Sequence, residues 1–461
     1  RRYGPGRPPP AREGPRAHNP IRKRRLTVIL TACFALAGAS SAGAQGSDAI
    51  RARDDRIADL ERKLDTLASE LDRVRTQVAV PEETELKSTY GLGPAASKIY
   101  GLERGLSIGG YGEANYTNFI ADENDDDFDR SDFLRNVLYV GYKFNESIIF
   151  NSEIEFEHAT TSDVGNGAGA GSVSVEFAAL DFFWKPYANF RAGMLLLPVG
   201  FLNEVHEPPF FFGVIRPEVE RRIIPSTWRE NGIGIFGKLG ESIEYRSYVT
   251  TGFNAQEFSD SGIRGGRQKG NRALAEDLAG TTRLDWTPEA LPGLLFGGSF
   301  YVGDSGQDQE IDGEDVPDSR LWLAELHAEY ERGPWHFRSL AAFSRLSDTQ
   351  ELNEVLGRDV DRPIAEAMLG GYAEAAYDIW PALFGNHDKS FEPFVRVEYV
   401  DTQFEVDRNF EENEMNTYWV FTPGLQFKPH PNVVLKMEYR NLRAFGGNRG
   451  DELSLGMGYA F

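Results

Sequence analysis

From residue 107 onward, apolar and polar residues alternate along many short segments of the chain. Residues 321–330, for example, place Trp322, Leu326 and Tyr330 on one face of a strand and Glu325 and Glu329 on the other, because successive side chains of a strand point to opposite sides. Most of these segments have the length of about 9–11 residues that a tilted strand needs to cross a bilayer. A soluble β-sandwich would give the same alternation, so the alternation alone does not identify the fold.

The connections between these segments favour a barrel. We predict sixteen strands, at 107–118, 133–144, 147–157, 172–184, 190–197, 232–239, 243–253, 277–286, 294–302, 321–330, 335–345, 367–377, 391–402, 416–427, 432–440 and 452–461. Short connections such as 185–189 alternate with long ones such as 198–231 and 441–451. Short turns at one end and long loops at the other are typical of an even-stranded outer-membrane barrel, whereas a sandwich gives no reason for this sorting.

The last predicted strand ends on an aromatic residue. Leu453, Leu455, Met457, Tyr459 and the terminal Phe461 share one face, and an ordinary edge strand would leave these five apolar side chains exposed. A chain that ends in this way resembles the outer-membrane assembly signal. We therefore expect the barrel-assembly machinery to be a partner through Phe461.

Residues 1–44 are predicted to be an upstream segment and a signal peptide. Four basic residues at 22–25 precede an apolar stretch at 26–38 and the small residues Ala42, Gly43 and Ala44, which is the order of a secretory signal. We predict cleavage after Ala44. The alternative is a lipoprotein cleavage box that ends at Cys33.

Residues 45–80 contain a heptad pattern of apolar residues. Ile50, Ile57, Leu64 and Leu71 lie seven apart, and Leu60, Leu67 and Val74 lie three after the last three of them. This narrow stripe predicts a coiled coil that needs partner chains; the alternative is an amphipathic helix that packs on its own chain. Pro81 ends the pattern, and residues 81–106 are predicted to be a linker.

Composition narrows the function classes. The 461 residues carry a formal net charge of −22, which disfavours a nucleic-acid partner. The longest apolar run, residues 26–39, is too short for a membrane-spanning helix, and a single cysteine excludes a cysteine-based zinc site or disulfide framework. The sequence lacks the common nucleophile and phosphate-loop motifs. We therefore predict no enzyme, no cofactor and no metal.

Several strand and turn motifs carry a family resemblance. They are residues 133–137 (FLRNV), 190–200 (FRAGMLLLPVG), 220–222 (ERR), 232–239 (GIGIFGKL), 370–379 (GGYAEAAYDI) and 422–439 (TPGLQFKPHPNVVLKMEY). With them, residues 107–461 resemble the phosphate-selective porin O and P family. The resemblance implies a sixteen-stranded trimeric pore for small hydrophilic solutes, with anions such as phosphate among them.

The residues that we expect to face the lumen depart from that family. They are Glu153, Glu155, Glu325, Arg338, Arg396, Lys436 and Arg440. Selection of phosphate would need a lysine-rich lumen, because a dehydrating anion must exchange water for cationic donors. These positions contain no ladder of lysines, so the residues themselves give no support for phosphate selectivity.

The longest predicted loop, residues 198–231, combines aromatic residues with charges of both signs. The resemblance implies that this loop folds inward and narrows the pore. Its candidate constriction residues are Arg216, Glu218, Glu220, Arg221, Arg222 and Arg229. Apposed arginines and carboxylates can filter solutes by charge, but they can equally pair with each other and hold the loop in place; both interpretations remain open.

Together these patterns predict an all-β protein: a 16-stranded antiparallel transmembrane β-barrel over residues 107–461, preceded by an N-terminal coiled-coil helix. We expect a homotrimer in the lipid of the cell outer membrane of a Gram-negative bacterium, with the coil in the periplasm. The expected function is that of a porin, which passes small hydrophilic solutes or ions passively. The alternative is a structural barrel with a closed lumen that tethers the envelope.

Overall fold

The computed structural model describes residues 56–70, 86–120, 128–165 and 169–461. The chain divides into two compact units, Arg1–Leu71 and Asp72–Phe461. In the first unit, residues 56–70 form a helix on which Ile57, Leu60, Leu64 and Leu67 are 44% to 64% exposed. The helix agrees with the heptad pattern. Its association with other chains stays a prediction, and the signal peptide lies outside the described residues.

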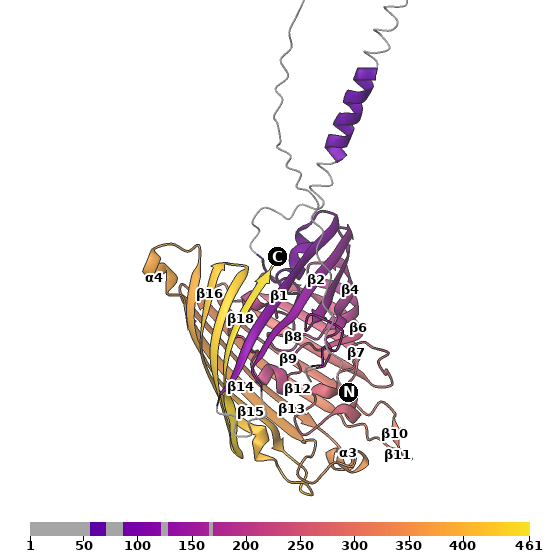
Figure 1. Cartoon of the computed structure of the whole chain (residues 1–461). Helices are drawn as coiled ribbons and strands as arrows, with labels where there is room; N and C mark the ends of the chain where they lie inside the picture. Colours follow the sequence, from indigo (N-terminus) through magenta and orange to yellow (C-terminus); the bar gives the residue numbers. More distant parts are fainter. Residues whose placement is uncertain (1–55, 71–85, 121–127, 166–168) are drawn as a thin grey trace, which may run out of the picture. The chain divides into compact units, whose positions relative to one another are not determined.

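Sixteen strands of the second unit form one closed antiparallel barrel, in which the first strand pairs with the last (Figure 1). The barrel strands are β1 (Gly105–Ile120), β2 (Arg130–Asn145), β3 (Ile148–Glu157), β4 (Val173–Lys185), β5 (Ala188–Leu196), β6 (Arg229–Leu239), β7 (Ile243–Thr251), β8 (Leu278–Trp286), β9 (Leu294–Gly303), β12 (Leu321–Arg332), β13 (Trp335–Leu346), β14 (Ala367–Tyr377), β15 (Ser390–Glu405), β16 (Thr417–His430), β17 (Val433–Ala444) and β18 (Gly447–Ala460). The predicted sixteen-stranded barrel is therefore confirmed.

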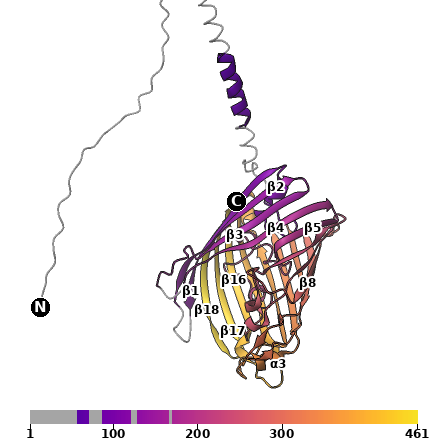
Figure 2. The ribbon, with the colours of Figure 1, turned by 90° about the vertical axis from the view of Figure 1, so that its right-hand side faces the viewer.

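The barrel has two unlike ends. At the end that we call the turn end, short connections such as 146–147, 186–187 and 240–242 join the strands; the loop end carries longer ones such as 197–228, 252–277 and 347–366. Figure 1 shows the C-terminus and α4 (Trp380–Phe384) at the turn end, and α3 (Thr349–Val355) with the β10–β11 hairpin (Glu310–Ile311, Glu314–Asp315) at the loop end. Figure 2 shows the C-terminus and α3 at these two ends from another side.

One predicted long loop, residues 441–451, is wrong. Strands β17 and β18 continue through most of it and are joined by residues 445–446. The polar side chains that indicated a loop pair across the two strands instead: Asp451 accepts hydrogen bonds from Tyr439 at 2.5 Å and from Asn441 and Arg443 at 2.9 Å. Cross-strand polar pairs of this kind stabilise a hairpin.

The predicted linker over residues 81–106 also needs correction. Its described residues, 86–104, pack against the inner side of the barrel and include the 3-10 helix η1 (Ala96–Gly101). Leu92, Ala95 and Ile99 are buried, and Leu92 and Ala95 share a cluster with Tyr111 and Tyr139. Apolar burial therefore fixes residues 86–101, which were predicted to belong to a linker, against the barrel.

The largest apolar cluster among the described residues joins the inner face of the barrel to the long loops. It contains inward-facing strand residues such as Tyr301 and Val420 and residues of the long loops, among them Val219, Ile223 and Trp228. The remaining short helices belong to the connections: η2 (Pro208–Phe210), α2 (Val219–Arg222), η3 (Ala255–Glu257), η4 (Arg264–Gly266) and η5 (Glu414–Asn416). In the part of the chain that the structure describes, no helix combines the length and the apolar character needed to cross a membrane.

Candidate functional site

Charged residues line the inner face of the barrel wall, and large apolar residues cover its outer face. On β12, Glu325 and His327 are 2% and 1% exposed, whereas Leu326 between them is 60% exposed. On β13, Phe337 is exposed and its neighbour Arg338 is buried. The structure places all seven predicted lumen-facing residues on the inner face and buries them: Glu153, Glu155, Glu325, Arg338, Arg396, Lys436 and Arg440.

The connection between β5 and β6, residues 197–228, lies inside the barrel. Most of its residues are buried, and its apolar side chains supply a large part of the inner apolar cluster. Trp228 stacks on Phe253 from the next long loop, with ring centroids 4.7 Å apart, and packs against Tyr301 of β9 at 4.8 Å. Apolar packing thus seats this loop in the lumen, as the family resemblance implied.

Three wall residues bind the backbone of this loop over residues 211–215. Lys436 donates to two loop carbonyl oxygens at 2.7 and 2.8 Å, and Arg396 donates to two more at 3.2 and 3.0 Å. Glu438 accepts hydrogen bonds from two loop N–H groups at 3.0 and 2.8 Å. Sequence reasoning missed Glu438, although its alternation with Met437 and Tyr439 would have placed it on the inward face. These wall charges position the loop.

Glu218 is the centre of an ion-pair cluster at one end of α2. Its carboxylate lies 2.7 Å from Arg221, 3.3 Å from Arg222 and 2.6 Å from Arg440 of the wall. Burial alone would raise the pKa of Glu218, but the three arginines outweigh burial and hold that pKa well below its usual value. The ionised Glu218 carboxylate therefore joins the loop to β17 through its ion pair with Arg440.

Of the other candidate constriction residues, Glu220 and Arg229 have polar partners, whereas one atom of Arg216 has none among the described residues. Glu220 accepts hydrogen bonds from a loop N–H at 2.6 Å and from Tyr372 at 2.7 Å, and burial raises its pKa. Arg229, which the structure assigns to β6, lies 2.7 Å from Glu176. Arg216 is buried, and its Nη2 atom finds no hydrogen-bond partner among the described residues.

A second group of buried charges lies where β1, β2 and β3 face the loop. Arg135 is 3.3 Å from Glu155 and 3.7 Å from Glu113, and His206 of the loop is 3.4 Å from Glu153. Burial, together with Arg216 and Arg135, lowers the pKa of His206 to about 3. Several of these atoms lack a hydrogen-bond partner in the described chain, namely Glu113 Oε2, Arg135 Nε and Nη1, Glu153 Oε2, Glu155 Oε1 and His206 Nδ1. Buried polar atoms of this kind call for ordered water.

A cavity of about 620 Å³ opens at the turn end of the lumen. Phe201 and residues 209–212 of the inner loop line it, together with residues 86–88 and wall residues near the turns, such as Glu241 and Thr287. Charges of both signs face it, including Arg338 and Glu392. We call this cavity the vestibule.

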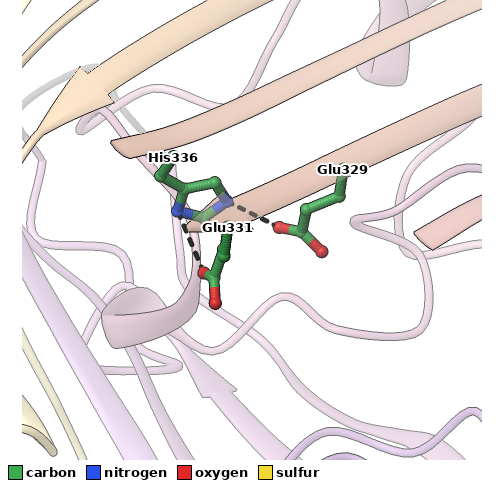
Figure 3. Close-up of side chains that lie close together, drawn as sticks. All are labelled: Glu329, Glu331 and His336. Atoms are coloured by element: carbon green, nitrogen blue, oxygen red, sulfur yellow. Dashed lines mark hydrogen bonds and ion pairs between the residues drawn. The ribbon is translucent and has the colours of Figure 1, made fainter. Parts of the chain in front are cut away.

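Glu329, Glu331 and His336 lie close together (Figure 3) and are among the residues that line the vestibule. The three residues offer ligand atoms within 4.8 Å of one another. The His336 ring lies 2.8 Å from Glu329 and 3.2 Å from Glu331, and Arg338 donates to Glu329 at 2.5 Å. In this structure the Glu329 carboxylate pairs with both the His336 imidazole and the Arg338 guanidinium, so the contacts of the cluster form an ion-pair network.

His327 lies in a separate network of the same wall. It contacts Glu325 at 3.0 Å and Asp285 at 2.9 Å. Asp285 also pairs with Arg283 at 2.9 Å and with Arg246. His327 and His336, on the neighbouring strands β12 and β13, thus have different carboxylate partners.

Comparison with known proteins gives one relative by sequence. No family model matches the chain. A protein of Aquifex aeolicus (strain VF5), described as uncharacterized, is 38% identical over 376 residues, which cover 80% of this chain and 82% of that protein. The specific resemblance to phosphate-selective porins therefore stays a prediction.

Several solved structures are similar to this chain at low identity. A loop-deletion mutant of OmpT, an outer membrane protein of Vibrio cholerae, has a TM-score of 0.49 at 10% identity, covering 78% of this chain and all 100% of the other. The outer membrane channel DcaP of Acinetobacter baumannii has a TM-score of 0.49 at 13% identity and 77% and 97% coverage. An anion-selective porin from Comamonas acidovorans has a TM-score of 0.47 at 11% identity and 78% and 100% coverage.

Proposed function

The chain belongs to one family with the Aquifex aeolicus protein, and we propose that it forms a passive channel for small hydrophilic solutes or ions in the cell outer membrane of a Gram-negative bacterium. The observation that carries this proposal is the closed barrel with charged residues inside and large apolar residues outside. A closed barrel satisfies every backbone hydrogen bond within the wall, as a bilayer requires. An apolar outer face with a polar lumen is the distribution expected of an outer-membrane barrel.

The proposed route has a wide part and a narrow part. The vestibule, at about 620 Å³, has room for a small solute at the turn end. Beyond it, residues 197–228 fill much of the lumen. We place the narrow part between this loop and the wall at β1–β3. There Arg135 and Glu155 form an ion pair at 3.3 Å, but buried atoms of Arg135, Glu153 and Glu155 make no hydrogen bond to the described chain, and water would bind to them.

The proposal names no preference for phosphate. Lys436 lies on the inner face, but its ammonium group donates to loop carbonyl oxygens and so holds the loop rather than binding a solute. Acidic residues outnumber basic ones in the group of Glu113, Arg135, Glu153 and Glu155, so a pore along this wall gives no particular support for anions.

A homotrimer is part of the proposal. The exposed apolar stripe on the helix over residues 56–70 would be covered by the same stripe of further copies, as in a coiled coil. We propose that this helix lies in the periplasm and that the barrel contacts lipid. The channel works without a cofactor and without catalytic chemistry.

One observation favours a second candidate, a structural barrel with a closed lumen. The inner loop is buried along most of its length, and wall charges bind its backbone at Lys436, Arg396 and Glu438. A loop fixed in this way could close the barrel, which would leave the protein as an anchor for the envelope.

Conductance in planar bilayers distinguishes the two candidates. The channel proposal expects discrete current steps from the purified full-length protein, and the reversal potential in a salt gradient then gives its ion preference. A barrel that inserts into the bilayer and passes no current at any voltage would overturn the channel proposal in favour of the closed barrel.

A further inference from the structure

We propose that residues 86–102 are a tethered plug: a peptide ligand of the barrel's own inner face that narrows the turn end and fixes the inner loop. This inference rests on the proposed channel function, because a plug matters only where solutes pass.

The plug fits an apolar site on the inner wall. Leu92, Ala95 and Ala96 are buried in one cluster with Tyr111 of β1 and Tyr139 of β2. Phe177, Val137 and Leu196 of the wall complete this cluster. The neighbouring inward positions of β3 carry Glu153 and Glu155, so this apolar part of the inner face is suited to a bound apolar segment.

Hydrogen bonds from wall side chains fix the plug in register. Asn151 donates to the carbonyl oxygen of Ala96 at 2.9 Å. Arg191 donates to the carbonyl oxygen of Tyr90 at 3.0 Å and to the Tyr100 hydroxyl at 2.9 Å. That hydroxyl donates to Asp181 at 2.6 Å. The hydrogen bonds to backbone carbonyl oxygens bind the main chain of this segment, and the bond to the Tyr100 hydroxyl binds one of its side chains.

The plug also contacts the inner loop. The backbone N–H of Ala95 donates to the carboxylate of Glu207 at 2.9 and 3.1 Å. A side chain at Gly93 would place its Cβ 2.4 Å from Glu207 Oε1, and one at Gly91 would come 2.1 Å from Glu204 Oε1. These glycines let the plug and the loop approach closely. A displacement of the plug would therefore remove contacts of the inner loop.

The plug borders the open part of the lumen. Leu86, Ser88, Gly91 and Pro94 line the vestibule opposite wall residues such as Glu329. The chain enters β1 at Gly105, directly after the plug, so the plug stays tethered to the barrel when it leaves its site. Departure of the plug would widen the vestibule and release Glu207.

The test uses the full-length protein in planar bilayers. Ile99 is fully buried, so Ile99→Asp would bury an unpaired carboxylate and expel the plug without altering the wall. Glu103→Gln changes an exposed residue beside the plug and is the matched control. Since conductance follows the open width of a pore, we expect Ile99→Asp to raise the single-channel conductance by about twofold or more and Glu103→Gln to leave it unchanged.

A labelling experiment reports the position of the plug independently of current. Cys33 is the only cysteine, so in the Cys33→Ser background an Ala95→Cys variant has one thiol. Ala95 is 1% exposed, so the thiol of the Ala95→Cys variant should be shielded while the plug is bound. We expect a maleimide to label this thiol at least about tenfold more slowly than it labels the same thiol when Ile99→Asp is also present.

The outcomes separate the two proposals. Rapid labelling of Ala95→Cys in the otherwise unaltered protein, or a released plug with unchanged conductance, overturns the plug while the channel function stands. If labelling shows that the plug is released but no variant conducts any current, both the channel function and the proposed control of conductance by the plug are overturned. Slow labelling with an increased current on release supports both.

Discussion

The carboxylate of Glu438 offers the sharpest test of how the inner loop is held. It accepts hydrogen bonds from the buried N–H groups of Val214 and Ile215 at 3.0 and 2.8 Å. Glu438→Gln keeps the shape and one acceptor oxygen, but its amide group leaves one of these N–H groups without an acceptor. An unsatisfied buried donor costs about 1–3 kcal/mol. The fraction of molecules with an unseated loop should therefore rise by about fivefold to somewhat more than a hundredfold.

Trypsin can measure that fraction. Its sites after Arg221 and Arg222 lie in α2 and are engaged with Glu218 while the loop is seated. When loop opening is fast relative to cleavage, the cleavage rate follows the population of the open form. Mass spectrometry of the fragment that starts at Ile223 identifies this cut among those in other loops.

The control is Glu405→Gln, which removes a carboxylate of β15 that pairs with Arg345 and is exposed. We expect cleavage after Arg222 to be at least about fivefold faster in Glu438→Gln and unchanged in Glu405→Gln. Equal rates in Glu438→Gln and the unaltered protein would refute the argument that wall side chains seat the loop.

Three further predictions concern the loop and the plug. Arg221→Ala and Arg222→Ala each remove a partly exposed partner of the Glu218 carboxylate, which keeps its buried partner Arg440. Each variant should therefore destabilise the seated loop by less than about 1 kcal/mol and leave the reversal potential unchanged; a changed reversal potential would show that these arginines filter ions. Burial raises the pKa of Glu207 from 4.5 to about 8. Departure of the plug would expose this group and return its pKa toward the ordinary value, so the plug is held most firmly below about pH 4.5 and loosens as pH rises from there to about 8. Labelling of Ala95→Cys, normalised to an exposed thiol, should therefore accelerate over this range and level off above it, and should lose this pH dependence in Glu207→Gln; an unchanged dependence would refute the assignment. Trp228→Ala should destabilise the loop seat by about 3–5 kcal/mol, seen as faster trypsin cleavage, and a normal rate would contradict the stacking argument.

The sequence predicts the barrel wall because the wall follows a local rule. Alternation at period two and the sorting of turn lengths depend on neighbouring residues, as with Glu325 and Leu326. Where that rule breaks, the prediction fails. The polar residues of 441–451 resemble a loop, yet Asp451 joins them across two strands.

The contents of the lumen could be predicted only in part. The charges of the inner loop are visible in the sequence, but the partner of Glu218 on the wall, Arg440, lies 222 residues away. The same holds for the bond between Ala95 and Glu207, 112 residues apart. Such pairs depend on the closed topology, which brings distant segments into one lumen, and no local pattern contains them.

The central claim is that residues 105–460 close into a barrel that is apolar outside and charged within. The mobility of the purified protein in a detergent gel, compared without heating and after boiling, tests it most directly. A closed barrel keeps its backbone hydrogen bonds in detergent, so we expect the unheated protein to migrate differently from the boiled one. Identical mobility before and after boiling, from a protein that stays soluble without detergent, would contradict the account.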